Sequence, residues 1–202
     1  MSTFFTADTH FDHLNIIKYS KRPFATAEEM NATLIANWNK IVAPTDTVYH
    51  LGDFAVGGGP AGPYRRQLNG KIHLVIGNHE KRALAEAGLF ESIDWMMEVK
   101  IESQMIVLCH YAMKTWNMSH KGSWHCFGHS HGTLPDDPNA LSADVGVDCW
   151  NYAPVSMAQL RAFMAKKTFK PVDHHNVHTG GASFGAGDFT PMRAPAPADL
   201  RV

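Results

Sequence analysis

The chain has 202 residues and a hydrophobic fraction of 45%, values that are typical of one globular domain or at most two small ones. Its 18 basic and 19 acidic side chains nearly cancel, which argues against strong nonspecific binding to nucleic acid, because such binding needs a basic excess. No apolar stretch approaches the length that spans a bilayer, so we expect no membrane segment.

The N-terminal segment and the cysteines indicate the compartment. The sequence MSTFFTADTHFDH has neither the basic start nor the apolar run of a signal peptide. The 3 cysteines, Cys109, Cys126 and Cys149, are too few and too scattered for a disulfide framework, and no CxxC pair occurs. We therefore expect reduced thiols in a cytoplasmic protein.

Short apolar runs alternate with polar segments along the chain. In chain order, the pattern predicts a strand over 3–7, a helix over 26–42, a strand over 46–51, a short helix over 64–68, a strand over 71–76, a helix over 81–87, strands over 97–101, 104–110, 123–127 and 143–148, and a helix over 156–165. The order favours an α/β layered domain, in which the strands 97–101 and 104–110 form a hairpin.

The helix over 26–42 carries the clearest start signal. Thr26 is a plausible N-cap, and Glu29 follows it at the spacing of a capping box. The far end of the chain is different, because Gly, Ala and Pro become frequent after Pro171 and the periodicity disappears. We predict one domain over 1–170 and an extended tail over 171–202.

Polar motifs follow several of the predicted strands directly. Because side chains alternate along a strand, an Asp-x-His or His-x-His spacing lets two side chains point the same way. Glycine beside such residues lets the backbone turn sharply or approach a ligand closely. The motifs are Asp8-Thr-His10, Gly52-Asp53, Gly77-Asn78-His79-Glu80, His110 and Gly128-His129-Ser-His131.

These motifs offer carboxylate, amide and imidazole groups that bind metal ions. The set is larger than one ion needs, and it fits two divalent ions if one carboxylate bridges them. Mixed oxygen and nitrogen donors without thiolate suit Mn, Fe, Zn, Ni or Co, with manganese favoured. Two such ions close together form the arrangement used for displacement at phosphorus. The candidate ligands are Asp8, His10, Asp53, Asn78, His110, His129 and His131.

Four further residues allow more than one interpretation. His110 by itself is more often a buried core histidine, and core packing also explains His50 better than a role beside a ligand. His13 could reach the substrate or simply pack within its loop. Arg82 could contact a phosphate, although an exposed arginine at a helix start is the more common case.

The motif series DTH, GD, GNHE, H and GHSH, over residues 8–131, resembles the calcineurin-like metallophosphoesterase superfamily. The segments TADTHFDHLNIIKYSKRPF, DTVYHLGDFAVGG, LNGKIHLVIGNHE and VGVDCWNYAPVS are similar to a bacterial and phage branch of small single-domain phosphoesterases. The resemblance implies a four-layer αββα sandwich, in which two stacked mixed β-sheets are flanked by helices.

The resemblance also implies a role for each motif residue. His79 matches the family histidine that faces the substrate phosphate, which implies a general acid or a donor to the developing charge. The implied ligands divide between two metals: Asp8, His10 and His131 hold the first, Asn78, His110 and His129 hold the second, and Asp53 bridges.

These roles predict a dinuclear metal-dependent phosphoester hydrolase, in which a metal-bridging hydroxide attacks phosphorus. In the Ser/Thr phosphatases of the superfamily the second motif is GDxxDRG, and its arginine clamps the phosphate; here the motif reads GDFAVGG. We therefore expect a phosphodiesterase that acts on a small diester or a nucleotide. The alternatives are a phosphomonoesterase or pyrophosphohydrolase and, from another class, a noncatalytic metal-binding scaffold.

Overall fold

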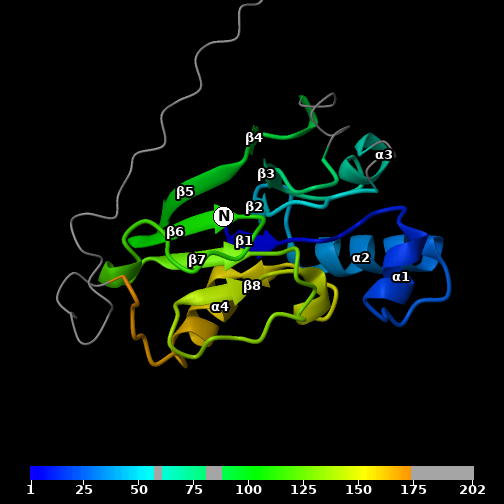
Figure 1. The fold of residues 1–202 in the computed structure, drawn as a ribbon. Coiled ribbons are helices and arrows are strands. Elements are labelled where there is room, and N and C mark those ends of the chain that lie inside the picture. The colour runs from blue at the N-terminus through cyan, green and yellow to red at the C-terminus, as the bar shows by residue number, and fades with distance from the viewer. Residues whose placement is uncertain (57–60, 81–87, 174–202) are drawn as a thin grey trace, which may run out of the picture.

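The computed structural model of the chain describes residues 1–56, 61–80 and 88–173 (Figure 1). The first of its two sheets has the strand order β4-β3-β2-β1-β9. Four strands are parallel and the last is antiparallel to β1: β1 (Thr3–Thr6), β2 (Thr47–His50), β3 (Lys71–Val75), β4 (Ser92–Asp94) and β9 (Val155–Ser156).

The second sheet has the order β5-β6-β7-β8. Its strands are β5 (Met96–Ile101), β6 (Gln104–Cys109), β7 (Trp124–Phe127) and β8 (Ser142–Asp144). β5 and β6 pair antiparallel, with Ile101 opposite Gln104, so the predicted hairpin is confirmed. β6, β7 and β8 are parallel to one another.

Alternate residues of the first sheet serve two separate cores. Phe4 lies in one buried cluster with Trp38 of a helix, whereas Phe5 lies in another with Leu108 and Cys126 of the second sheet. Neighbouring residues of a strand point to opposite faces, which is why one apolar run supplies both clusters. The second cluster therefore lies between the sheets, which stack face to face.

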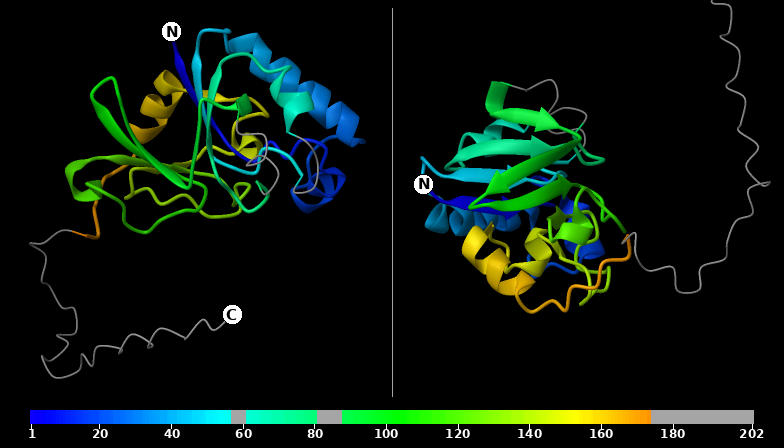
Figure 2. Two further views of the ribbon diagram at one scale, coloured as in Figure 1. Left: turned by 90° about the horizontal axis from the view of Figure 1, so that it is seen from above. Right: turned by 90° about the vertical axis from the view of Figure 1, so that its left-hand side faces the viewer.

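Helices flank this pair of sheets. The α-helices are α1 (Leu14–Tyr19), α2 (Ala27–Ile41), α3 (Gly62–Arg65) and α4 (Met157–Met164), and the 3₁₀ helices are η2 (Ser119–Lys121) and η3 (Val147–Cys149). α2 packs on the first sheet, and α4 lies against β9, β1 and β8 on another side of the strands (Figure 2). The predicted α/β class, with two stacked mixed sheets and flanking helices, is confirmed.

The start of α2 agrees with its predicted signal. The side chain of Thr26 accepts a hydrogen bond from the backbone N–H of Glu29 at 3.1 Å, so Thr26 is the N-cap. The Glu29 carboxylate accepts from the backbone N–H of Ala25, one residue before the cap, at 2.8 Å. The first bond satisfies a backbone donor that the first helical turn leaves free, and the second ties the residue before the cap to the helix.

Some predicted elements differ from the structure. The strand predicted over 143–148 is wrong beyond Asp144, because the Oδ1 atom of Asp144 accepts a hydrogen bond from the N–H of Gly146 at 2.8 Å and turns the backbone before η3. The short helix predicted over 64–68 begins and ends earlier, as α3. Four short elements, α1, β4, η2 and β9, were not predicted.

Two predictions lie outside the described residues: the helix over 81–87, and the tail beyond residue 173. Within the described part of the chain, no helix is both long enough and apolar enough to cross a membrane.

Candidate metal centre

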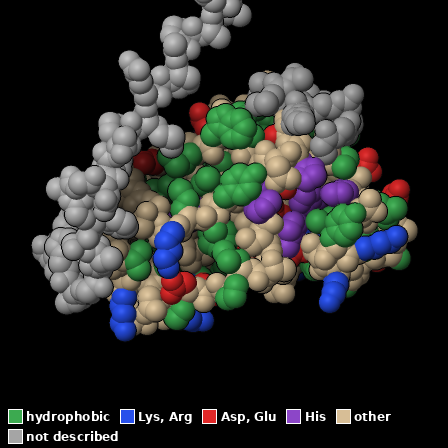
Figure 3. All heavy atoms as spheres, in the orientation of Figure 1, with side chains coloured by type: hydrophobic (Ala, Val, Ile, Leu, Met, Phe, Trp, Pro, Cys, Tyr) green, Lys and Arg blue, Asp and Glu red, His purple; other side chains and the backbone are tan. Residues whose placement is uncertain are grey.

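The carboxyl ends of parallel strands bring the predicted motifs together. β1, β2 and β3 are parallel, and Asp8, Asp53 and Asn78 follow their ends. In the other sheet, His110 follows β6 and His129 follows the parallel strand β7. Figure 3 shows histidine side chains gathered in one region of the surface, beside acidic side chains. The site therefore draws on both sheets of the sandwich.

The loops that carry these residues have an unusual backbone. Few residues with a side chain adopt a left-handed conformation, and Asp, Asn and His are enriched among them. Backbone bonds hold the loops in place, since the N–H of Asp8 donates to the Gly52 carbonyl at 3.0 Å and that of His10 to the Asp53 carbonyl at 2.9 Å. The predicted ligands with left-handed φ values are Asp8 (58°), His10 (49°), Asp53 (56°), His129 (66°) and His131 (48°).

Glycine permits the close approach of these loops at two positions. Gly52 has a φ of 93°, and a Cβ atom there would lie 2.6 Å from Nδ1 of His110. A Cβ atom on Gly128 would lie 2.7 Å from Oδ2 of Asp8. Both distances are shorter than van der Waals contact, so the predicted need for glycine beside Asp53 and His129 has a steric cause.

Among the residues that the structure describes, three groups of side chains present atoms that could hold a metal ion. Within each group, one nitrogen or oxygen atom per residue lies within 4.8 Å of the others. The groups are Asp8, His10 and His131; His10, Asp53 and His79; and Asp53, His110 and His129. We name the first the Asp8 cluster and the last the His110 cluster. The Asn78 side chain joins the His110 cluster, because its Oδ1 lies 3.2 Å from Nε2 of His110 and 3.1 Å from Nδ1 of His129.

Asp53 lies between the two clusters. Its Oδ2 atom is 3.5 Å from Nε2 of His10 and 3.5 Å from Nε2 of His110. The Nε2 atom of His79 is 4.0 Å from the same oxygen, and the backbone N–H of His79 donates to Oδ1 at 3.0 Å. A single carboxylate thus faces imidazoles from both clusters and from the GNHE motif.

The surroundings of His110 fix which of its nitrogens faces the site. Its Nδ1 atom lies 2.7 Å from the carbonyl oxygen of Leu51. A carbonyl only accepts hydrogen bonds, so Nδ1 carries the proton of the neutral ring and Nε2 presents a lone pair. This lone pair points toward the oxygens of Asp53 and Asn78, which are also electron donors, and a cation is the natural partner of such a set.

The surroundings of His10 and Asp8 also fit a metal ion. The Nε2 atom of His10 is buried and has no hydrogen-bond partner among the described residues, an arrangement that costs free energy. Burial lowers the pKa of His10, which keeps its imidazole in the neutral form that binds metals. Burial also raises the pKa of Asp8 well above its usual value, and the carboxylates of Asp144 and Asp53 raise it further. A cation would relieve this repulsion.

Sequence reasoning missed residues that hold the loops of the predicted ligands in place. Glu80 is buried, and its two oxygens accept from the N–H groups of Phe54 at 2.7 Å and Gly77 at 2.6 Å, which joins the loops of Asp53 and Asn78. Burial raises the pKa of Glu80 to about 7. Arg22 and Asp148 were missed as well, although the segments that contain them, KYSKRPF and VGVDCW, belong to the stretches that resemble the family.

The residues with two interpretations also have definite positions. His13 lies beside His10, with their Nδ1 atoms 3.3 Å apart, and its ring centroid is 5.6 Å from that of His79. His50 is buried among aromatic rings and bonds the hydroxyl of Thr9 at 3.0 Å, so it packs in the core and braces the Asp8 loop. Arg82 lies outside the described residues.

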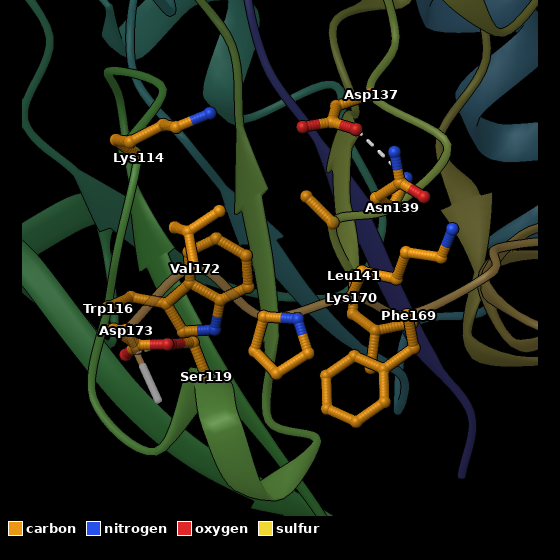
Figure 4. Close-up of a pocket in the computed structure, with 12 residues that line it drawn as sticks. Lys114, Trp116, Ser119, Asp137, Asn139, Leu141, Phe169, Lys170, Val172 and Asp173 are labelled. Carbon is orange, nitrogen blue, oxygen red and sulfur yellow. Dashed lines mark hydrogen bonds between the residues drawn. The ribbon is translucent and has the colours of Figure 1, made fainter. Parts of the chain in front are cut away.

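A separate cavity of about 320 Å³ lies elsewhere on the molecule (Figure 4). Trp116, Leu141 and Phe169 supply apolar walls, and Lys114 and Lys170 contribute ammonium groups. None of the predicted site residues lines it.

Comparison with other proteins gives the relatives of the chain. No protein-family model matches it. It is 36% identical over 159 residues to the uncharacterized protein MJ1445 of Methanocaldococcus jannaschii, and the match covers 75% of this chain and 84% of that protein. The chain belongs to the family of that protein. It is also 30% identical over 88 residues to the gene 66 protein of Mycobacterium phage L5, over 39% of this chain and 40% of the phage protein.

A solved structure shares the fold. The protein of unknown function AQ665 from Aquifex aeolicus has a TM-score of 0.63 and 23% identity, and the alignment covers 80% of this chain and 98% of that one. This likeness shows the fold that the sequence predicts, two stacked mixed sheets with flanking helices, and the motif residues meet at the edge of these sheets.

Proposed function

We propose that the protein is a metal-dependent phosphodiesterase that hydrolyses a small diester or a nucleotide. The observation that carries the proposal is the position of Asp53, whose Oδ2 lies 3.5 Å from Nε2 of both His10 and His110. A carboxylate between two imidazole-rich clusters suits two divalent ions that share a ligand.

The proposed ligands divide between two ions. When bound, the ions supply positive charge for the phosphoryl oxygens and lower the pKa of water toward neutrality. Oxygen and nitrogen donors without thiolate suit Mn, Fe, Zn, Ni or Co, and we favour manganese. The Asp8 cluster would hold one ion, the His110 cluster with Asn78 would hold the other, and Asp53 would bridge: the full set is Asp8, His10, Asp53, Asn78, His110, His129 and His131.

His79 is the proposed catalytic side chain. Its ring is 30% exposed, whereas Asp53 beside it is almost fully buried. An imidazole at the open side of the clusters can donate a proton to a leaving oxygen or a hydrogen bond to developing charge. His13 lies next to it and is a candidate contact for the substrate.

Among the described residues, the arginine beside the Asp8 cluster is not available to clamp a phosphate, and this favours a diester over a monoester. Arg22 is buried, and its guanidinium is committed to Asp148 and to the carbonyl oxygens of Asp8 and Thr9. It is therefore not free to hold a terminal phosphate, which carries more charge than a diester. Tyr111 offers an exposed aromatic face beside His129, with ring centroids 4.8 Å apart, and such a face suits a nucleobase.

One assay tests the proposal and its competitors. A chromogenic diester and the corresponding monoester are compared with Mn²⁺ added to EDTA-stripped protein. We expect turnover of the diester, and its loss in EDTA. Faster turnover of the monoester would instead identify a phosphomonoesterase, and metal binding without turnover of any ester would identify a scaffold.

A further inference from the structure

A buried arginine contacts both the loop that carries Asp8 and the carboxylate that bonds His131, another member of the Asp8 cluster. The Arg22 side chain is fully buried and holds Asp148 with two bonds, from Nε to Oδ1 at 2.8 Å and from Nη2 to Oδ2 at 2.8 Å. The same guanidinium donates to the carbonyl oxygens of Asp8 at 2.7 Å and Thr9 at 3.1 Å. One planar group therefore fixes both the Asp8 loop and the carboxylate of Asp148.

Asp148 in turn fixes His131. Its Oδ2 atom lies 2.7 Å from Nδ1 of His131. An ionised carboxylate only accepts hydrogen bonds, so Nδ1 carries the proton and Nε2 of the neutral ring presents its lone pair. The ring of His131 lies against that of His10, with centroids 5.1 Å apart. The contacts thus run from Arg22 through Asp148 to the ring of His131, which is a member of the Asp8 cluster.

The His110 cluster is supported in a different way. Nδ1 of His110 bonds the neutral carbonyl of Leu51, whereas Nδ1 of His131 bonds a carboxylate. A carboxylate makes the ring that it accepts from a stronger electron donor. Burying the ion pair of Arg22 and Asp148 costs desolvation free energy, so the pair is weak evidence for a gain in stability. The position that the pair gives to His131 is the better explanation for it.

We propose that Arg22 and Asp148 are positioning residues that hold His131 in the Nε2-presenting tautomer, in register with Asp8, and so set the metal affinity of the Asp8 cluster. Neither residue needs to touch the metal or the substrate. The inference rests on the metal-binding part of the proposed function, and its effect is confined to one of the two clusters.

The first test is calorimetric titration of the metal-free full chain with Mn²⁺. We expect Asp148→Asn to weaken one of two binding steps by roughly 10–100-fold and to leave the other step unchanged. The matched control is Asp136→Asn, because Asp136 is exposed, pairs with Lys167 and belongs to none of the three groups. Native affinity at both steps in Asp148→Asn would overturn the inference, and an equal loss at both steps would assign the pair a general structural role.

The second test reads the tautomer without metal or substrate. Nitrogen-15 spectra of the histidines, recorded on the native metal-free chain at mildly alkaline pH, should show His131 protonated at Nδ1. A ring protonated at Nε2 would overturn the inference, whether or not any variant folds. In Asp148→Asn and in Arg22→Lys, which cannot form the two-bond contact, we expect a mixture of tautomers. A native chain that binds no Mn²⁺ but keeps this tautomer would contradict the proposed function and leave the positioning contact intact.

Discussion

The Oδ2 atom of Asp53 lies 3.5 Å from Nε2 of His10, a contact between an acceptor and an imidazole nitrogen that has no other partner among the described residues. Replacing Asp53 with Asn keeps the shape and removes the charge. We expect Asp53→Asn to lose metal binding at both sites. The turnover rate should fall by about 10³-fold or more, which corresponds to several kcal/mol of lost transition-state stabilisation. Metal content per chain and diester hydrolysis are the measurements.

Asp12→Asn is the control for this change. Asp12 is an exposed acid of the loop that carries Asp8 and His10, and it belongs to none of the three groups. The Asp12→Asn variant should keep both metal ions and hydrolyse the diester at the native rate. Full Mn²⁺ binding by Asp53→Asn would rule out the bridging role.

His79→Ala should separate catalysis from metal binding. The backbone N–H of His79 that bonds Asp53 remains in this variant, so the loop should keep its shape. We expect the metal content to stay native and kcat to fall by about 10²–10⁴-fold, the usual contribution of a general acid. Because His79 also belongs to one of the metal-competent groups, loss of a metal ion in His79→Ala would identify it as a ligand instead.

Tyr111→Ala tests whether the site prefers a nucleotide. The side chain is 45% exposed beside two predicted ligands. Stacking of a base is worth about 1–3 kcal/mol, so we expect KM for a nucleotide ester to rise roughly 5–100-fold and KM for a nonaromatic diester to change little. Tyr19→Ala on α1, at a residue that is 74% exposed, should leave both KM values unchanged. Equal changes for both substrates would argue against stacking.

His50 should make the fold sensitive to acid. Burial lowers its pKa to about 3, with a smaller effect from His110, whereas an unfolded chain has a histidine pKa of about 6.5. Between these values the unfolded state binds more protons, so stability is present above the unfolded pKa and is lost as the pH falls toward the folded pKa. From pH 7 to pH 5, this one group should account for about 2 kcal/mol of the loss.

The variant His50→Leu removes this titration together with the bond to Thr9. Urea unfolding at pH 7 and at pH 5 measures the loss of stability between the two pH values. This loss should be about 2 kcal/mol smaller in the variant than in the native chain. An equal loss of stability in the native chain and in His50→Leu would show that His50 does not carry the effect.

Thr26→Ala should weaken the start of α2. The lost bond to the Glu29 N–H leaves a helical donor without its cap, and we expect a cost of about 1 kcal/mol in the free energy of unfolding. Urea unfolding of the metal-free chain measures it, with Thr33→Ala as the comparison. Thr33 bonds the Glu29 carbonyl from within the helix and caps nothing, so its replacement should cost less.

The sequence predicted the elements whose signals are local. The cap at Thr26, the hairpin of β5 and β6, and the motifs at strand ends all depend on residues close together along the chain. The edge strand β4 and the two-residue β9 carry no such signal, because they exist only through pairing with distant strands. Local patterns do not encode these pairings.

The site followed the same division. Ligand types and spacing predicted Asp8, His10 and His129 as ligands, and the parallel strands bring these residues together. Arg22 and Asp148 have no motif of their own, since their importance comes from a contact between distant parts of the chain. Buried charged residues are rare unless they are paired, yet burial itself is not visible in a sequence.

The left-handed turns have a consequence for how this protein can diverge. At Asp8 and His129 a replacement must satisfy the backbone as well as the chemistry, and Asn or Gly meets the first demand where Val or Ile does not. We expect relatives that have lost hydrolysis to carry Asn or Gly at these positions and to keep the loop. The shape of these loops would then outlast the proposed reaction, and a relative could reuse the loops to bind a partner.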